Sequence, residues 1–251
     1  MTNPFDLAGR IAVVTGANTG IGQGMALALA EAGADIVAVG RTPPTGTEAQ
    51  VTALGRAFLS VEADLATLEP IPRIVEATLA RFGRLDILVN NAGVIRRADA
   101  VDFTEADWDA VVDVNLKSAF FLAQAAGRQM IKQGGGKIIN VASMLSYQGG
   151  IRVASYTASK SGLAGLTRLL ANEWAAKGIN VNAIAPGYIE TNNTEALRAD
   201  EGRSRDILAR IPAGRWGRPS DLGGAAVFLA SSASDYVHGT LLAVDGGWLA
   251  R

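Results

Sequence analysis

The fold is decided near the start of the chain by the stretch Ile11–Gly22, which reads IAVVTGANTGIG. Its first five residues, Ile11–Thr15, form an unbroken apolar run that is typical of a strand covered on both faces in a parallel sheet. Three glycines follow in the spacing Gly-x3-Gly-x-Gly, at Gly16, Gly20 and Gly22. Glycines at a strand-to-helix turn let the backbone and the positive end of the helix approach a pyrophosphate. The stretch therefore predicts a dinucleotide-binding loop, although tight turns alone also favour glycine.

Similar apolar runs recur along the chain and alternate with longer amphipathic segments. Strands are expected at Ile11–Thr15, Asp35–Gly40, Ala57–Glu62, Leu85–Asn90, Gly136–Ala142, Asn180–Ala185 and Thr240–Val244. Helices are expected near residues 20–32, 67–82, 104–132, 154–177 and 219–231. Strands that alternate with helices form βαβ units with right-handed connections. The prediction is a Rossmann-type, doubly wound α/β fold: a seven-stranded parallel sheet with helices on both faces, in a single domain over residues 1–251.

Residues 191–212 are a polar, helix-like insertion between a strand and a helix, and they leave this alternation. In an open α/β sheet, an insertion after the carboxyl end of a strand lies over the ligand crevice. We therefore expect a substrate lid here. The alternative is a surface excursion, and the arginines near 198–210, which alternate with acids, are expected to form a solvated helix face.

Composition excludes several classes of function. Lys and Arg number 23 against 24 Asp and Glu, so the chain lacks the basic excess that a nucleic acid or an anionic membrane would require. There is no cysteine and a single histidine, His238, which argues against any metal site built on thiolate or imidazole ligands. No secretory signal or run of membrane-spanning length is present, so a soluble, cytoplasmic protein is expected.

The end of the second expected strand bears on the choice of dinucleotide. An acidic residue there would bind both ribose hydroxyls and repel a 2′-phosphate, but the chain has Arg41 instead. Arg41 favours NADP(H) through charge-assisted bonds to that phosphate. The alternative is a solvated loop arginine, with NAD(H) bound without an acidic partner. Asp64, after the third expected strand, is placed to contact the adenine, or else to cap the next helix.

Tyr156 and Lys160 lie four residues apart at the start of an expected helix, so their side chains share one face. A phenol is a weak base at neutral pH, and a neighbouring ammonium lowers its pKa. Such a phenol suits proton exchange with an alcohol or a carbonyl oxygen. Taken alone, a pair of this spacing is more often a contact on a helix surface.

Further motifs accompany this pair, and together they make the chain resemble the short-chain dehydrogenase/reductase family along its whole length. The motifs are Thr15–Gly22, Asn90-Asn91-Ala92-Gly93, Asn115, Ser143, Tyr156 with Lys160, and Pro186-Gly187. The resemblance implies a Rossmann fold, nicotinamide-dependent hydride transfer, and the catalytic tetrad Asn115, Ser143, Tyr156 and Lys160. It also implies a homotetramer, with the helices at 104–132 and 154–177 on a dimer face.

The resemblance implies a role for each member of the tetrad. Tyr156 exchanges the proton with the substrate oxygen, and Ser143 polarises that oxygen by a hydrogen bond. Lys160 lowers the pKa of Tyr156 and binds the nicotinamide ribose, while Asn115 holds a water that links Lys160 to solvent or, alternatively, satisfies a neighbouring carbonyl. The implied cofactor contacts are Gly16, Asn18, Thr19, Gly20, Ile21, Gly22, Arg41, Asp64, Leu65, Asn91, Ala92, Gly93, Tyr156, Lys160, Pro186, Gly187, Ile189 and Thr191.

Four stretches, 143–153, 185–194, 211–217 and 244–251, resemble a subgroup of the family that acts on deoxy sugar acids in uronate and pectin breakdown. This resemblance implies interconversion of a hydroxy-keto sugar acid and its diketo form. It favours NAD(H), in contrast to Arg41. A sugar acid requires a cation for its carboxylate and donors for its hydroxyls. The expected substrate contacts are Ser143, Gln148, Arg152, Tyr188 and Asn192. Of the candidate cations Arg96, Arg97 and Arg152, the last is placed on the carboxylate because it lies between Ser143 and Tyr156, and Asn193 is a further candidate amide.

Three other functions are weighed against this one. A gluconate 5-dehydrogenase and a 3-oxoacyl reductase share the chemistry, but the polar loops argue against a long acyl chain. A dinucleotide-binding protein without catalysis is the alternative of a different class. The intact tetrad argues against it, because a protein that only binds has no use for a tuned phenol.

Overall fold

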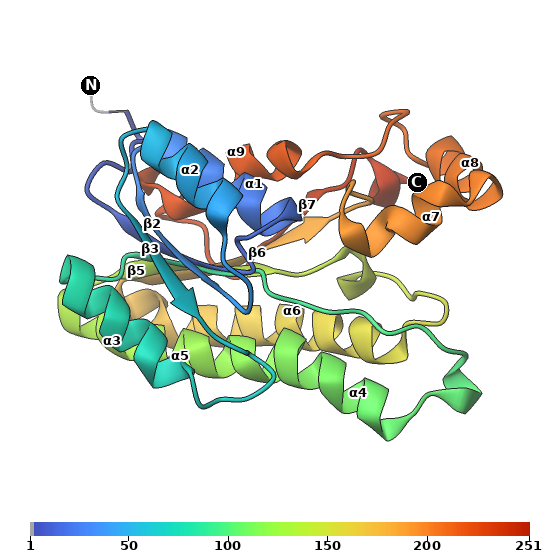
Figure 1. The fold of residues 1–251 in the computed structure, drawn as a ribbon, viewed down its shortest axis with the longest axis horizontal. Helices are drawn as coiled ribbons and strands as arrows, with labels where there is room; N and C mark the ends of the chain where they lie inside the picture. The colour runs from blue at the N-terminus through green and yellow to red at the C-terminus, as the bar shows by residue number, and fades with distance from the viewer. Residues whose placement is uncertain (1–2) are drawn as a thin grey trace.

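The computed structural model describes residues 3–251, and a seven-stranded sheet forms its centre (Figure 1). The strands are β1 (Ile11–Thr15), β2 (Asp35–Gly40), β3 (Phe58–Glu62), β4 (Ile87–Asn90), β5 (Gly136–Val141), β6 (Ile179–Pro186) and β7 (Leu241–Val244). They pair in the order β3-β2-β1-β4-β5-β6-β7, and every pair is parallel. The predicted Rossmann-type, doubly wound sheet is confirmed.

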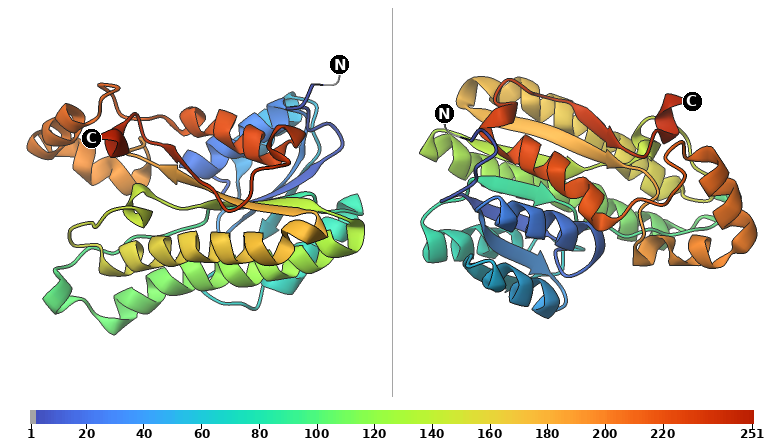
Figure 2. Two further views of the ribbon diagram at one scale, coloured as in Figure 1. Left: turned by 180° about the vertical axis from the view of Figure 1, so that it is seen from behind. Right: turned by 90° about the horizontal axis from the view of Figure 1, so that it is seen from above.

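Helices cover both faces of this sheet (Figures 1 and 2). The helices are α1 (Gly20–Glu31), α2 (Thr45–Ala53), α3 (Ile71–Phe82), α4 (Glu105–Val112), α5 (Ser118–Gln133), α6 (Ala154–Trp174), α7 (Glu195–Ala199), α8 (Glu201–Arg210) and α9 (Gly223–Ala230). Helices α1, α2 and α9 pack on one face, and α3, α5 and α6 pack on the other. The order of the strands reverses between β1 and β4, which places the ligand crevice at their carboxyl ends.

The apolar run of β1 is unbroken because its side chains enter two separate cores. Ala12 and Val14 belong to the core under α1 and α9, whereas Ile11 and Val13 belong to the core under α3 and α5. Alternate side chains of a strand point to opposite faces, so a strand covered on both sides requires apolar residues throughout.

Helix α2 was not expected from the sequence. It follows Pro44 and contains Thr-Gly-Thr at its start, and only Thr47 and Val51 are buried along it. A helix with so little apolar surface lacks the 3.6-residue periodicity on which the prediction relied. Its position between β2 and β3 nevertheless completes a βαβ unit.

The helix expected over 104–132 is present without a gap in the chain of helical residues. Its α-helical geometry changes to a π-helical turn at Asp113–Lys117, between α4 and α5. A π turn shifts the register of the side chains on either side of it. A regular α-helix would place Trp108 and Asn115, seven residues apart, on one face, but here Trp108 is 42% exposed. Asn115 itself lies within the π turn and is fully buried.

The polar insertion contains a short turn at Asn192–Thr194 followed by α7 and α8, and it projects from one end of the molecule (Figure 2). It is anchored by a small apolar cluster that joins Ile207 and Ile211 to Met144, Trp216 and Trp248. None of the helices described within residues 3–251 has the length and apolar character needed to cross a bilayer.

Candidate active site

The glycine turn after β1 forms a cradle that only small residues fit. Gly16 and Gly20 have φ values of +66° and +58°, in the left-handed region that favours glycine. A Cβ atom at Gly22 would collide with the carbonyl oxygen of Gly16 and with the side chain of Asn91. Thr19 precedes α1 without capping it through its side chain, so the first amide N–H groups of α1 remain available to an anion. This cradle fits a dinucleotide pyrophosphate.

Hydrogen bonds fix the cradle to the end of β4. The Thr15 hydroxyl accepts the N–H groups of Asn91 and Ala92 at 2.9 and 2.8 Å. The Asn91 side chain in turn donates to the carbonyl oxygen of Thr15 at 2.8 Å. These bonds therefore hold the Asn91-Ala92-Gly93 motif after β4 against the glycine turn.

A groove of about 360 Å³ runs from this cradle past the ends of β2 and β3. Of the residues predicted to bind cofactor, it brings together Gly16, Asn18, Arg41, Asp64, Leu65, Ala92 and Gly93. Arg41 follows β2 and lines the groove, and its neighbour Thr42 accepts a hydrogen bond from Asn18 at 2.8 Å. The one acidic residue among those that line the groove, Asp64, follows β3. Asp64 also accepts the N–H of Ala66 at 3.0 Å, so it closes a local turn while facing the groove.

Several other predicted cofactor residues lie outside this groove. Thr19, Ile21 and Gly22 open α1, and Pro186 ends β6. Thr191, at the start of the insertion, lies 3.3 Å from the position of a Cβ atom built on Gly20. Ile189 lines a separate hollow, described below.

A second pocket, of about 410 Å³, holds Ser143 and Tyr156 on its wall together with Gln148, Gly187 and Tyr188. It adjoins the groove through segment 94–97, because Val94 and Arg96 line the groove whereas Ile95 and Arg97 line the pocket. The Ser143 hydroxyl oxygen accepts the N–H of Leu145 at 3.1 Å, which leaves its own proton free to donate into the pocket.

Lys160 and Asn115 stand behind this wall. Lys160 is 4% exposed, and its ammonium donates to the carbonyl oxygen of Val141 at 2.6 Å. The nitrogen lies 5.6 Å from the centre of the Tyr156 ring. Asn115 accepts the N–H of Val94 at 2.8 Å and donates to its carbonyl oxygen at 2.9 Å. Asn115 thus satisfies a neighbouring carbonyl, the alternative foreseen for it, and its water-holding role stays a prediction.

The pKa of Tyr156 shifts in the direction opposite to the one expected from the sequence. Burial raises the pKa of the Tyr156 phenol above its ordinary value, and the Ser143 side chain and the charge of Arg97 oppose that rise only in part. Burial lowers the pKa of Lys160 to about 8. Because desolvation outweighs the attraction of nearby cations, the phenol keeps its proton at neutral pH.

The structure does not bring Arg152 and Asn192 to the pocket. Arg152 adopts a φ of +63°, which turns its side chain outward, where it is 59% exposed and pairs with Asp99 at 3.2 Å. Three other arginines line the pocket instead: Arg97, Arg203 and Arg210. Arg203 and Arg210 are exposed, as expected for a solvated helix face, and they also line the pocket. They lie seven residues apart with the buried Ile207 between them, a spacing that marks one face of a helix.

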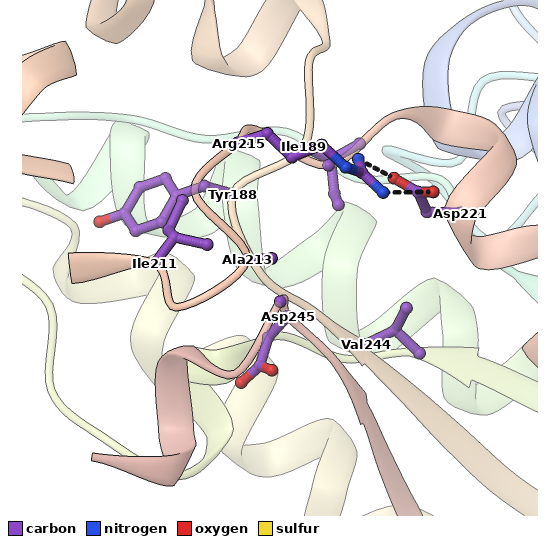
Figure 3. Close-up of a pocket in the computed structure, with 10 residues that line it drawn as sticks. Tyr188, Ile189, Ile211, Ala213, Arg215, Asp221, Val244 and Asp245 are labelled. Carbon is purple, nitrogen blue, oxygen red and sulfur yellow. Dashed lines mark hydrogen bonds and ion pairs between the residues drawn. The ribbon is translucent and has the colours of Figure 1, made fainter. Parts of the chain in front are cut away.

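A further hollow of about 270 Å³ lies at the base of the insertion and contains none of the tetrad (Figure 3). Its charged groups are already satisfied, since Arg215 forms two bonds to Asp221, at 2.7 and 3.0 Å. This pairing lowers the pKa of Asp221 to about 2. Among residues 3–251, no group of three or more His, Asp or Glu side chains is arranged to hold a metal ion.

Comparisons with known proteins agree with this geometry. Residues 16–249 match the family model described as enoyl-(acyl carrier protein) reductase. The chain is 66% identical, over 98% of both sequences, to 2-dehydro-3-deoxy-D-gluconate 5-dehydrogenase of Escherichia coli. It is 59% identical, over the full length of both chains and with a TM-score of 0.92, to an Agrobacterium tumefaciens structure named for 2-deoxy-D-gluconate 3-dehydrogenase with bound NADP. A gluconate 5-dehydrogenase of Burkholderia cenocepacia, in complex with NADP and tartrate, is 42% identical over 99% of this chain and 98% of its own, with a TM-score of 0.94.

The buried ammonium predicts a pH dependence of stability. Lys160 has a pKa of about 8 in the folded chain against 10.5 in the unfolded chain, so between these values the unfolded state holds more protons. The free energy of unfolding therefore rises with pH in this window. The difference in unfolding free energy between wild type and Lys160→Met should increase by about 2 kcal/mol from about pH 8 to about pH 10.

Denaturant titrations at both pH values measure this difference, and the titration of Tyr156 cancels in it unless the two groups are coupled. The exposed Lys132 provides the control, since Lys132→Met should show no such change with pH. Equal pH dependence in wild type and Lys160→Met would contradict the prediction.

Proposed function

Because the chain belongs to the short-chain dehydrogenase/reductase family, we propose that this oxidoreductase interconverts 2-dehydro-3-deoxy-D-gluconate and its 2,5-diketo form with a nicotinamide cofactor. The observation that carries the proposal is that Ser143 and Tyr156 line one pocket that adjoins the glycine-cradled groove. The bound nicotinamide supplies or accepts the hydride. The chain supplies the position of the substrate and the proton.

In this proposal Tyr156 donates its proton to the carbonyl oxygen as that oxygen becomes an alkoxide. The phenol is suited to donation because its burial keeps it neutral. In the reverse direction Tyr156 must first lose its proton, so oxidation is favoured at higher pH. Ser143 donates a second hydrogen bond to the same oxygen and stabilises the developing charge.

Lys160 and Asn115 act behind the tyrosine. The Lys160 ammonium uses one of its three N–H groups on the carbonyl oxygen of Val141. The remaining two are free for the ribose of the cofactor. Asn115 holds Val94 at the junction of groove and pocket, and one lone pair of its oxygen remains for a water on the way to solvent.

We further propose that the cofactor is NADP(H) in preference to NAD(H). Arg41 lines the groove at the end of β2, and the residue before it is Gly40, which offers no carboxylate to the ribose hydroxyls. A guanidinium at this point is complementary to a 2′-phosphate. The Agrobacterium and Burkholderia structures, which contain NADP, support the same choice.

We also propose that the protein is a homotetramer. It acts in the cytoplasm, on products of uronate and pectin breakdown. Helices α4, α5 and α6 lie on the same side of the sheet (Figure 1) and carry exposed apolar side chains, among them Trp108, Phe121, Ile131 and Leu169. Apolar surface of this kind is typical of a contact between subunits. Residues 191–212 serve as the substrate lid, since α8 contributes to the wall of the pocket.

Turnover of the sugar acid tests the reaction. Wild type should oxidise 2-dehydro-3-deoxy-D-gluconate with reduction of the cofactor, followed as absorbance at about 340 nm. It should be less active in oxidising gluconate and, with the reduced cofactor, in reducing a 3-oxoacyl ester. Tyr156→Phe should lower kcat by about a hundredfold to ten-thousandfold because the proton donor is lost. Its affinity for NADPH, measured by fluorescence, should not change. Undiminished turnover by Tyr156→Phe would show that the acid–base group lies elsewhere.

Arg41→Ala tests the choice of cofactor. We expect its Kd for NADPH to rise about tenfold while its Kd for NADH stays unchanged, because only NADPH carries the 2′-phosphate. Arg96, which also lines the groove but pairs with Asp107 at 3.3 Å, provides the matched control. Arg96→Ala should affect both cofactors alike. An equal loss of NADH and NADPH in Arg41→Ala would contradict the assignment.

Light scattering tests the assembly. The wild-type particle should have four times the 26.0 kDa mass of the chain. Leu169→Glu, on α6, should dissociate it, because burying a carboxylate in an apolar contact is costly. Leu54→Glu is the control: Leu54 is 43% exposed and Leu169 45%, but Leu54 follows α2 on the other side of the sheet. Dissociation by both variants, or by neither, would argue against this face.

A further inference from the structure

The inward face of α8 carries two arginines into the pocket. Arg203, Ile207 and Arg210 lie four and three residues apart, so they share one face of the helix, and all three line the wall near Tyr188. Arg205 lies on the opposite side of α8 and borders an outer hollow with Arg198 and Leu208. Helix α8 therefore presents Arg203 and Arg210 to the pocket and Arg205 to the outer side.

The cations of the pocket are not neutralised by the chain. Within residues 3–251, no carboxylate lies within ion-pair distance of Arg97, Arg203 or Arg210. Asp206 is the one acidic residue among those that line the pocket, against three arginines. This excess of positive charge favours the binding of an anion in the pocket.

The indole ring of Trp248 holds the Arg210 side chain in place. The guanidinium carbon of Arg210 lies 4.1 Å from the centre of the Trp248 ring, which positions the cation over the aromatic face. Trp248 is buried and donates its indole N–H to Gln148 at 3.3 Å. Stacking of this kind orients the plane of the guanidinium and leaves its N–H edge available to a carboxylate.

The positive charges are spread across the pocket. Arg97 acts on Tyr156, where it opposes the rise in the pKa of the phenol. Arg203 and Arg210 act on Tyr188 in the same sense, although burial still raises the pKa of that residue. Arg203 and Arg210 therefore lie near Tyr188, whereas Arg97 lies near the proton donor Tyr156.

We infer that Arg203 and Arg210 bind the carboxylate of the substrate from the inner face of α8. The inference rests on the proposed function and specifies its substrate class: the enzyme selects an acid over its neutral counterpart. A fork of N–H donors from each arginine matches a carboxylate, and a bound acid joins α8 to the wall that carries Tyr156.

Steady-state kinetics with 2-dehydro-3-deoxy-D-gluconate and with its neutral methyl ester test the inference. Arg203→Gln and Arg210→Gln should each raise KM for the acid about tenfold, leaving KM for the ester and Kd for NADPH unchanged. Arg205→Gln, which removes the same charge from the outer side of α8, should leave all three values within about twofold of wild type. Arg210→Lys, which keeps the charge without the fork, should recover part of the loss.

Two results would overturn the inference: an equal rise in KM for acid and ester, or an equal effect of Arg205→Gln. Failure of the proposed function would be visible separately, as absence of turnover by wild type. The carboxylate site is then measured by calorimetry, with D-gluconate against the neutral polyol D-glucitol. Binding of gluconate alone, abolished in the double variant, would support the site, and no discrimination between the two ligands would refute it.

Discussion

The hydrogen bonds between Thr15 and the backbone of Asn91 and Ala92 are the constraint on which the rest of the site depends. They join the ends of β1 and β4, the two strands between which the order of the sheet reverses. At that point the crossovers diverge to opposite faces and leave a crevice. Because the two strand ends are fixed to each other, the position of the glycine turn relative to segment 94–97 is also fixed. That segment lines both the groove and the pocket, so the two lie side by side.

The sheet could be predicted from the sequence because its signal is local. The central strands are short apolar runs whose side chains enter two cores, as Val13 and Val14 do. Ser143 and Tyr156 were also predictable, since motif order along the chain fixes their places at strand ends and helix starts, and they line one pocket. Helix α2 was missed because its stability comes from completing a crossover and not from an apolar face of its own.

Other features depend on contacts that are distant in sequence. No pattern in the sequence predicts the π turn around Asn115, whose side chain pairs with the backbone of the distant Val94. The position of Arg152 depends on a left-handed backbone and a partner, Asp99, from another loop. The raised pKa of Tyr156 follows from burial, which a sequence does not display, so the expected effect of Lys160 was given too much weight.

The insertion keeps the arginines proposed for substrate recognition apart from the residues proposed for the reaction. Asn115, Ser143, Tyr156 and Lys160 belong to the sheet and its packed helices, whereas Arg203 and Arg210 stand on a short helix attached through a five-residue apolar cluster. Mutations in α8 can therefore accumulate with little disturbance to the buried scaffold. Relatives with this architecture can change their sugar-acid specificity through substitutions in α8 while the residues of the hydride-transfer site stay the same.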